Sequence, residues 1–142
     1  EAFLAYKTER YNIKGKDVVA GNCKYYLNDL SFKNFLYPGF AYGVGYLLEN
    51  AVYLELRRLG YIVYTGSFRD KEVDFVAMKD DRVIYLQATY MLETAQTMER
   101  EYAPLLTIGD NYEKYVVSMD EVQFPSNEGV RHIQAWNLKE IL

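Results

Sequence analysis

Two segments with alternating apolar side chains, joined by a short polar turn, constrain the fold most strongly. They are residues 72–78 (EVDFVAM) and 83–90 (VIYLQATY), and the turn between them is residues 79–82 (KDDR). Alternation over this length is typical of β-strands whose two faces have different surroundings. Because so short a connection joins neighbouring strands as a hairpin, the sequence predicts two antiparallel strands in one sheet.

The same turn fixes which residues face each other across the two strands. If the turn has four residues, Met78 pairs with Val83 and Asp74 lies opposite Gln87. The alternation places the Asp74 side chain on the face of Tyr85 and Gln87. A carboxylate in the middle of a covered strand is costly unless it is paired or binds a cation. Asp74 is therefore a candidate site residue, and a structural acid bonded to Gln87 or to a tyrosine hydroxyl is the alternative.

Residues 43–59 form the clearest predicted helix. Apolar residues recur there at helical spacing, two arginines fill the last turn, and Gly60 provides the stop. Glu49 falls at the rim of the apolar stripe, where a carboxylate either reaches over the edge of the sheet or is simply solvated. Glu55 lies nearer the middle of the stripe. We expect it to be either a second site residue or a buried acid tied to an arginine or a tyrosine.

The rest of the chain supplies a hairpin, a second helix and further strands. Residues 3–13 and 18–28 flank a turn in which Gly15 is expected to take a positive φ. Residues 94–107 are predicted to form a helix whose N-cap is Thr94. Pro104 is expected to kink this helix or to restart it as a new turn. Short links make the three strands after the first long helix antiparallel, and the crossing helix makes the fourth parallel to the third. The remaining predicted elements are a short helix at 31–37 capped by Asp29 or Ser31, strands at 61–66, 113–118 and 130–136, and a helical tail near Leu138.

Composition excludes several classes of protein. One cysteine, Cys23, and one histidine, His132, can form neither an internal disulfide nor a structural zinc site. A lone thiol fits a reducing compartment, so a cytoplasmic location is expected. No run of 18 apolar residues occurs, so we expect no membrane-spanning helix. The net charge of −4 disfavours strong general binding to nucleic acid, and His132 is expected to be a packed or surface residue.

Glu49 and Asp74 together are typical of a divalent-metal site. Mg²⁺ prefers hard oxygen ligands, usually one or two carboxylates with water and phosphate oxygens. A phosphodiester hydrolase uses such a metal to generate hydroxide and to stabilise charge on the phosphate, and a lysine often assists. Lys71 and Lys79 are the nearby candidates for that cation, although Lys79 lies at the turn, far from Gln87.

The order of predicted elements from residue 43 onward resembles the PD-(D/E)XK nuclease superfamily. The strings GYLLENAVYLELRRLGYIVYTG, KEVDFVA, VIYLQATY, TMEREYAPLLTIGDNY and KYVVSMD, in this order, resemble one domain more specifically. It is the C-terminal domain of unknown function that follows the AAA module in predicted bacterial and archaeal ATPases. The preceding ERYNIKGKDVVAGNCKYYLND is similar to that family's linking segment, with the hairpin as the wing of a winged-helix unit.

The resemblance implies a fold and a parent protein. The fold is α+β, with a restriction-endonuclease-like core (helix–β–β–β–helix–β, a mixed sheet flanked by helices) preceded by a wing-like β-hairpin. It divides the chain into residues 1–40, the hairpin and a short linking helix, and residues 41–142, the nuclease-like domain. The implied partner is an upstream ATPase module of the same polypeptide, and ATP would bind only there.

The resemblance also assigns site residues, and the site it assigns is degenerate. Glu49 matches the glutamate of the first helix, and Asp74 matches the aspartate of the second strand. The third motif should be Glu-x-Lys, but Gln87, Ala88 and Thr89 stand there. Glutamine is a neutral, poorer metal ligand, and threonine cannot supply the charge of lysine. The implied catalytic set is therefore Glu49, Asp74, Gln87 and Thr89, with Glu49 and Asp74 as the candidate ligands of Mg²⁺.

Three functional hypotheses follow from these observations. The leading one is an accessory C-terminal domain of an AAA-type ATPase that uses a nuclease-like fold to bind nucleic acid or a partner protein, with weak or absent catalysis. The second is an active Mg²⁺-dependent DNA nuclease that uses Glu49 and Asp74, with Gln87 as a neutral ligand. The third is a structural interaction module, or a homo-oligomerisation module, whose tyrosine-rich surfaces meet the ATPase part.

Overall fold

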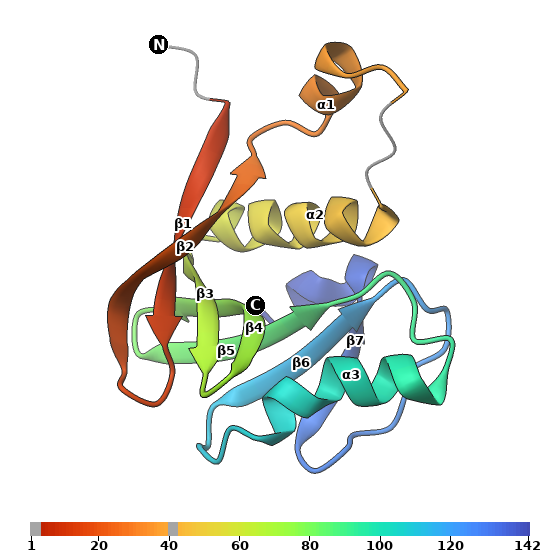
Figure 1. Ribbon diagram of the computed structural model, residues 1–142. Coiled ribbons are helices and arrows are strands. Elements are labelled where there is room, and N and C mark those ends of the chain that lie inside the picture. Colours follow the sequence, from red (N-terminus) through yellow and green to blue (C-terminus); the bar gives the residue numbers. More distant parts are fainter. Residues whose placement is uncertain (1–3, 40–42) are drawn as a thin grey trace.

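Over residues 4–39 and 43–142, the chain folds into one mixed seven-stranded sheet with helices on both faces (Figure 1). The computed structural model describes residues 4–39 and 43–142, except for the side chain of Leu36. None of the helices in this part is long and apolar enough to cross a membrane. In chain order the elements are β1 (Ala5–Asn12), β2 (Asp17–Leu27), α1 (Ser31–Leu36), α2 (Val44–Arg58), β3 (Ile62–Phe68), β4 (Lys71–Lys79), β5 (Arg82–Ala88), α3 (Ala95–Leu106), β6 (Glu113–Ser118), β7 (Val130–Gln134) and the 3₁₀ helix η1 (Ala135–Glu140).

The strand order is β2-β1-β3-β4-β5-β6-β7. The meander β3-β4-β5 is antiparallel, and β6 runs parallel to β5 across α3, as the sequence predicts. β7 is parallel to β6. β1 pairs with β3 in parallel, which no local sequence pattern predicts. The hairpin of the segment 1–40 therefore extends the same sheet as the segment 41–142, and the division into two domains stays a prediction.

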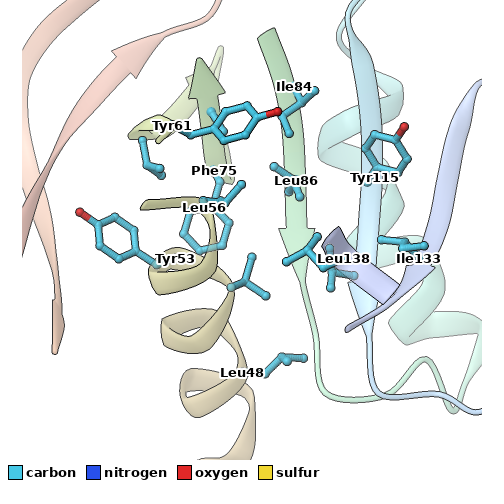
Figure 2. Packing of buried hydrophobic residues seen from close by; sticks show 14 of the residues in the cluster. Leu48, Tyr53, Leu56, Tyr61, Phe75, Ile84, Leu86, Tyr115, Ile133 and Leu138 are labelled. Carbon is cyan, nitrogen blue, oxygen red and sulfur yellow. The ribbon is translucent and has the colours of Figure 1, made fainter. Parts of the chain in front are cut away.

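Two apolar cores lie on the two faces of this sheet. α2 covers one face, where Leu56 is fully buried beside Phe75 and Leu86 (Figure 2). α3 covers the opposite face, where Leu105 packs with Val76 (Figure 1). Burying large aliphatic and aromatic side chains contributes about 1.5–3 kcal/mol each. The central strands β4, β5 and β6 are therefore buried between the two layers of helix.

Several local predictions are confirmed, and three are wrong. Gly60 ends α2 at φ +87, and the Thr94 side chain caps α3 by accepting from the backbone N–H of Thr97. In the hairpin turn, Lys16 rather than Gly15 takes the positive φ, at 54°. Pro104 does not restart α3 as a new turn, because it lies in the last turn of one continuous helix that ends two residues later. The predicted cap of α1 is also wrong, because the N-cap residue is Leu30 rather than Asp29 or Ser31, although Asp29 Oδ1 accepts from the Ser31 N–H at 2.8 Å.

Candidate functional site

A lysine ammonium lies among three carboxylates at the junction of the hairpin, α2 and β4. Lys24 Nζ is 3.0 Å from Glu49 Oε1, 2.9 Å from Glu72 Oε1 and 3.3 Å from Asp74 Oδ1. These four residues are called the Lys24 cluster below. Three separate elements contribute to it: β2 provides the lysine, α2 provides one acid and β4 provides two. The structure thus brings the two predicted acids, Glu49 and Asp74, to one cation.

An extra residue in β4 directs Asp74 into this cluster. Tyr64 of β3 pairs with Val76, and Gly66 of β3 pairs with Val73. From the first pair to the second, β3 advances by two residues and β4 by three, so β4 contains one extra residue. Val73 and Val76 consequently both pack in the α3-side core. In an unbroken strand, residues three apart face opposite sides. Such a bulge re-aims a side chain, and here it releases Asp74 from the regular alternation.

Two side chains replace the regular ladder where β4 meets β5 at this end. The backbone N–H of Asp74 donates to Gln87 Oε1 at 3.2 Å. In return, the backbone N–H of Ala88 donates to Asp74 Oδ2 at 2.9 Å. These two bonds satisfy backbone groups that would otherwise be unpaired inside the sheet. Gln87 therefore positions the Asp74 backbone, and the Asp74 carboxylate is held at both oxygens.

The predicted strand register is confirmed, but the predicted face of Asp74 is wrong. Met78 pairs with Val83, and the same register continues along the two strands as far as Phe75 and Leu86. Tyr85 packs in the core under α3. The Asp74 carboxylate instead meets Lys24 on the α2 side, because the bulge in β4 interrupts the alternation.

A second irregularity brings Lys24 into position. In the hairpin, Arg10 pairs with Val19, whereas Thr8, two residues earlier, pairs with Lys24. Between these two pairs, β1 advances by two residues and β2 by five, so β2 contains three additional residues. Without the three additional residues, Gly21 would lie opposite Thr8. The bulged segment moves Lys24 to that position, on the side of the hairpin that faces α2.

Glu49 is fixed by contacts on both sides of it. Its Oε1 accepts from the Tyr26 hydroxyl at 2.7 Å as well as from Lys24. The adjacent Asn50 clamps β2 to α2, because its side chain accepts from Leu27 N at 2.8 Å and donates to Leu27 O at 3.0 Å. The ring of Tyr26 stacks on Tyr53 of α2, with centroids 4.2 Å apart. The Glu49 side chain, which is predicted to lie at the rim of the apolar stripe of its helix, therefore points toward the hairpin.

Burial and crowding of like charge dominate the electrostatics. Burial and the Glu49 carboxylate raise the pKa of Asp74 to about 7, although Lys24 and the Ala88 N–H act against this. Burial alone would lower the pKa of Lys24, but Asp74, Glu49 and Glu72 hold it above its usual range. Burial and Glu49 raise the pKa of Tyr26. Several carboxylates compete for one ammonium, so the lysine stays charged and Asp74 keeps its proton to unusually high pH.

Glu72 forms the solvent-facing side of the cluster. Arg10 Nη2 donates to Glu72 Oε2 at 2.7 Å, while Lys24 contacts the other oxygen. Burial acts to raise the pKa of Glu72, but the bonds from Lys24 and Arg10 outweigh it and lower that pKa. The hairpin therefore supplies two cations to three acids, which leaves the site one negative charge in excess when all are ionised.

The other predicted candidates lie outside the cluster. Glu55 makes a two-point ion pair with Arg58, at 2.7 and 2.6 Å, so the predicted tie to an arginine is confirmed, but its side chain is 31% exposed and the predicted burial is wrong. Lys79 donates to the Leu59 carbonyl and is committed at the far end of β4. Thr89 is buried and its N–H donates to Val117 O; within the described part of the chain, no hydrogen bond or ion pair joins it to the cluster.

The donor set of the cluster fits an ammonium better than a divalent cation. Glu49 and Asp74 offer the hard oxygens that Mg²⁺ prefers. The point on which these oxygens converge, however, is held by Lys24 Nζ, and Gln87 already accepts from the Asp74 N–H. Over residues 4–39 and 43–142, no three Asp, Glu, His or Cys side chains are arranged as metal ligands. As arranged, the lysine supplies the positive charge that a metal would bring.

A groove of about 370 Å³ opens beside the cluster, between β2 and the segment carrying α1 and α2. Lys24 and Glu49 belong to its lining, so the groove and the cluster are continuous. Tyr25 and Tyr46 also line it and are 67% and 69% exposed, and Lys33 lies at its wall. Exposed aromatic side chains around a groove are typical of a binding surface.

Sequence reasoning finds two acids of the cluster, Glu49 and Asp74, but does not single out Glu72 or the lysine. In the sequence, Lys24 is one of several basic residues of a weakly basic hairpin, and Tyr26 is one of many tyrosines. The available signal is that both lie at alternate positions of one strand, with Tyr25 between them on the other side. Their target could not be inferred, because nothing in the sequence indicates that the hairpin joins the sheet beside β3.

Comparison with known proteins gives one relative. Over 117 residues, which are 82% of this chain, the sequence is 36% identical to an uncharacterized protein of Haemophilus influenzae (strain ATCC 51907 / DSM 11121 / KW20 / Rd). The match covers 28% of that protein, so the chain corresponds to well under half of its relative's length. No family model matches the chain. No solved structure matches it either.

Proposed function

We propose that this chain is an accessory domain of a larger AAA-family ATPase, with a restriction-endonuclease-like core that binds nucleic acid without cutting it. The element order α2-β3-β4-β5-α3-β6 supports such a core, since it follows the expected helix–β–β–β–helix–β. The Haemophilus relative supports the larger parent, because 72% of its length lies outside the match and leaves room for an ATPase module. ATP would bind in that module.

The Lys24 cluster is the observation that carries this proposal. A hydrolytic metal would need the oxygens of Glu49 and Asp74 that now contact the ammonium. The third acidic position is the neutral Gln87, which bonds the Asp74 backbone. A lysine at this point keeps the carboxylates paired and the hairpin fixed, so the cluster acts as a structural element of a binding domain.

The groove beside the cluster supports nucleic acid as the ligand. Single-stranded nucleic acid is typically bound by aromatic side chains that stack on bases, next to cations that meet the phosphates. Tyr25 and Tyr46 are exposed along the groove, and Lys33 lies beside them. The net charge of −4 means that few phosphates are neutralised, so the affinity should be modest and should fall steeply with salt.

The proposal is tested by fluorescence anisotropy with labelled single-stranded, duplex and branched DNA over a salt series. We expect single strands to bind best at low salt, and Tyr46→Ala to weaken binding. Tyr90→Ala is the matched control, because Tyr90 is also exposed but does not line the groove. The same samples incubated with Mg²⁺ or Mn²⁺ should leave the DNA intact. Cleavage that is lost in Asp74→Ala would contradict the proposal.

An active Mg²⁺-dependent DNA nuclease is the second candidate, and one observation favours it. Buried Asp74 and partly buried Glu49 share the single ammonium of Lys24, and burial together with the Glu49 carboxylate raises the pKa of Asp74 to about 7. A divalent ion would supply more positive charge there if Lys24 withdrew, and Lys24 would then take the role of the missing third-motif lysine. Calorimetry with Mg²⁺ and Mn²⁺, repeated on Asp74→Ala, separates the two: heat of binding in the wild type that disappears in the variant supports the nuclease.

An interaction or oligomerisation module is the third candidate. Phe35 and Tyr37, at the end of α1, are 82% and 64% exposed, which is unusual for large aromatic residues on a free surface. If none of the DNA probes binds even at low salt, these residues become the better candidates for a contact, with the ATPase part or with a second copy. Sedimentation of the wild type and of Phe35→Ser then tests the second copy directly.

A further inference from the structure

We propose that the loop between β6 and β7, residues 119–129, is a latch that neutral His132 holds closed and that opens when His132 is protonated. His132 lies on β7 and is 3% exposed, as expected for a packed residue. The loop crosses the sheet face that α3 covers, and its residue Phe124 packs against the core there. None of these residues belongs to the Lys24 cluster.

The imidazole of His132 bonds both the sheet and the loop. Its Nε2 lies 2.8 Å from the Ser118 hydroxyl of β6. Its Nδ1 accepts from the backbone N–H of Phe124 at 3.2 Å. The Phe124 ring packs edge-on against the imidazole, with centroids 5.0 Å apart, and Gln123 donates to the His132 carbonyl. The hydrogen bonds that Gln123 and Phe124 donate from the middle of the loop therefore both end on His132, in addition to the packing of Phe124 on the core.

The hydrogen bond from Phe124 fixes the protonation state. A backbone N–H can only donate, so Nδ1 must be unprotonated, and the neutral ring carries its proton on Nε2. Nε2 then donates to Ser118 Oγ. Ser118 Oγ in turn donates to Asp120 Oδ2 at 2.6 Å, and the same carboxylate oxygen accepts from the Leu92 N–H at 2.8 Å. Each hydrogen bond of this network has one donor and one acceptor only when His132 is neutral.

Protonation breaks this network on one side only. An imidazolium donates from both nitrogens, so Nε2–H keeps its bond to Ser118 while Nδ1–H points at the Phe124 N–H. Two donors facing each other in a buried place are strongly unfavourable. The loop side must therefore part, whereas the bond between β6 and β7 remains. This asymmetry makes the response a local opening of the loop.

The charged groups around His132 set the direction of its titration. Burial lowers the pKa of His132, and the Asp120 carboxylate acts against this by raising it. On α3, Tyr102 lies near enough for Asp120 to raise its pKa, although burial is the larger cause of that shift. Three other charged neighbours are paired with residues other than His132: Lys114 of β6 with Asp110, Arg131 of β7 with Glu113, and Glu101 of α3 with Arg100. Glu121 and Glu128 of the loop are exposed to solvent.

Opening the latch changes one wall of a cavity. Phe124 and the next three residues of the loop line a cavity of about 700 Å³ whose other wall is α3, with Met98 and Tyr102. The Tyr102 hydroxyl is buried there and has no hydrogen-bond partner among the described residues. When Phe124 leaves, the apolar wall of α3 that faces it across the cavity gains access to solvent. The device thus couples pH to the exposure of an apolar surface.

NMR on the intact chain tests the proposal, because His132 is the single histidine. Its Cε1–H resonance should titrate with a midpoint below about 6.5, the ordinary value. Amide exchange of Phe124, corrected for its intrinsic pH dependence, should accelerate as pH falls through that midpoint, by up to tenfold for each pH unit of the shift. Amides of β6 and β7 should keep their protection. A midpoint at or above the ordinary value would overturn the proposal.

Two variants separate the latch from a general role of His132 in folding. His132→Asn keeps an acceptor near the place of Nδ1 but does not titrate, so exchange at Phe124 should stay slow at pH 5. Ser118→Ala removes the sheet-side bond and should leave the pH dependence at Phe124 in place. Should the His132→Asn variant fail to fold, the wild-type titration still decides. Equal protection of Phe124 at pH 5 and pH 7.5, or simultaneous loss at all amides, would contradict a local latch.

Discussion

Replacing Lys24 by methionine is the sharpest perturbation of the candidate site. Methionine keeps much of the length and the apolar stem of lysine but removes the ammonium that contacts Glu49, Glu72 and Asp74. Three carboxylates would then face one another, with only Arg10 remaining on the outer side, at Glu72. We expect the hairpin to detach from α2 more easily, and the whole domain to lose stability.

The size of the loss follows from burial. Removing one partner of a fully buried ion pair costs about 3–5 kcal/mol, because the remaining charge has no compensation. The Lys24 side chain is 28% exposed, and Asp74 can relieve the repulsion by taking a proton, so we expect roughly 2–3 kcal/mol. For a domain of this size, that corresponds to a fall in melting temperature of about 6–9 °C.

The loss should depend on pH in a defined direction. The folded pKa of Asp74, about 7, lies above its unfolded value of about 3.9, so the folded state binds the extra proton between these values. The stability from that proton is present at low pH and is lost as pH rises through 7. Without Lys24 the repulsion is larger, so Lys24→Met should cost more at pH 8 than at pH 5.5.

Chemical denaturation of the wild type and Lys24→Met at both pH values measures this. Lys14→Met is the matched control, because Lys14 is exposed at the hairpin turn and should change stability by less than about 0.5 kcal/mol. Combining Lys24→Met with Asp74→Asn should recover part of the loss, with a coupling of about 1–2 kcal/mol. A loss below about 1 kcal/mol that is the same at both pH values would refute the reasoning.

Three further predictions concern single side chains. Tyr26→Phe removes a buried donor to Glu49 and should cost about 1.5–3 kcal/mol by urea denaturation; an unchanged midpoint would contradict the 2.7 Å contact. Gly66→Ala places a Cβ 2.8 Å from Val76 Cγ2 and should cost about 1–3 kcal/mol, whereas Gly45→Ala, with open space around it in α2, should gain about 0.5–1 kcal/mol. Asp74→Asn should flatten the loss of stability between pH 5.5 and pH 8 in thermal melts; a curve as steep as that of the wild type would show that another group titrates.

The sequence predicted most of the core architecture, because its periodicities are strong there. The helix ending at Gly60, the meander of three strands and the helical crossover all follow from local patterns, and all are present. The register from Met78 and Val83 needed only the length of the turn. These features depend on residues that are close in the chain, so local rules suffice for them.

The site was only partly predictable, because two bulges determine it. The bulge in β4 turns Asp74 out of the alternating pattern, and the one in β2 brings Lys24 opposite Thr8. The β4 bulge contains no Gly, Pro or Asn, whereas the β2 bulge contains Gly21-Asn22, a pair that is typical of turns and bulges but does not specify which residue it brings opposite Thr8. The parallel pairing of β1 with β3 is a long-range contact that no local pattern encodes. A lysine far from the acids in sequence thus completes a cluster whose acids alone resemble a metal site.

Crystals grown with Mn²⁺ test the central claim most directly, because manganese gives an anomalous signal at its own position. We expect electron density for Lys24 Nζ about 3 Å from Glu49 and Asp74, with no anomalous peak between the two acids. A manganese peak coordinated by both carboxylates, with the lysine displaced, would contradict the assignment of the cluster as a lysine-filled, non-catalytic site.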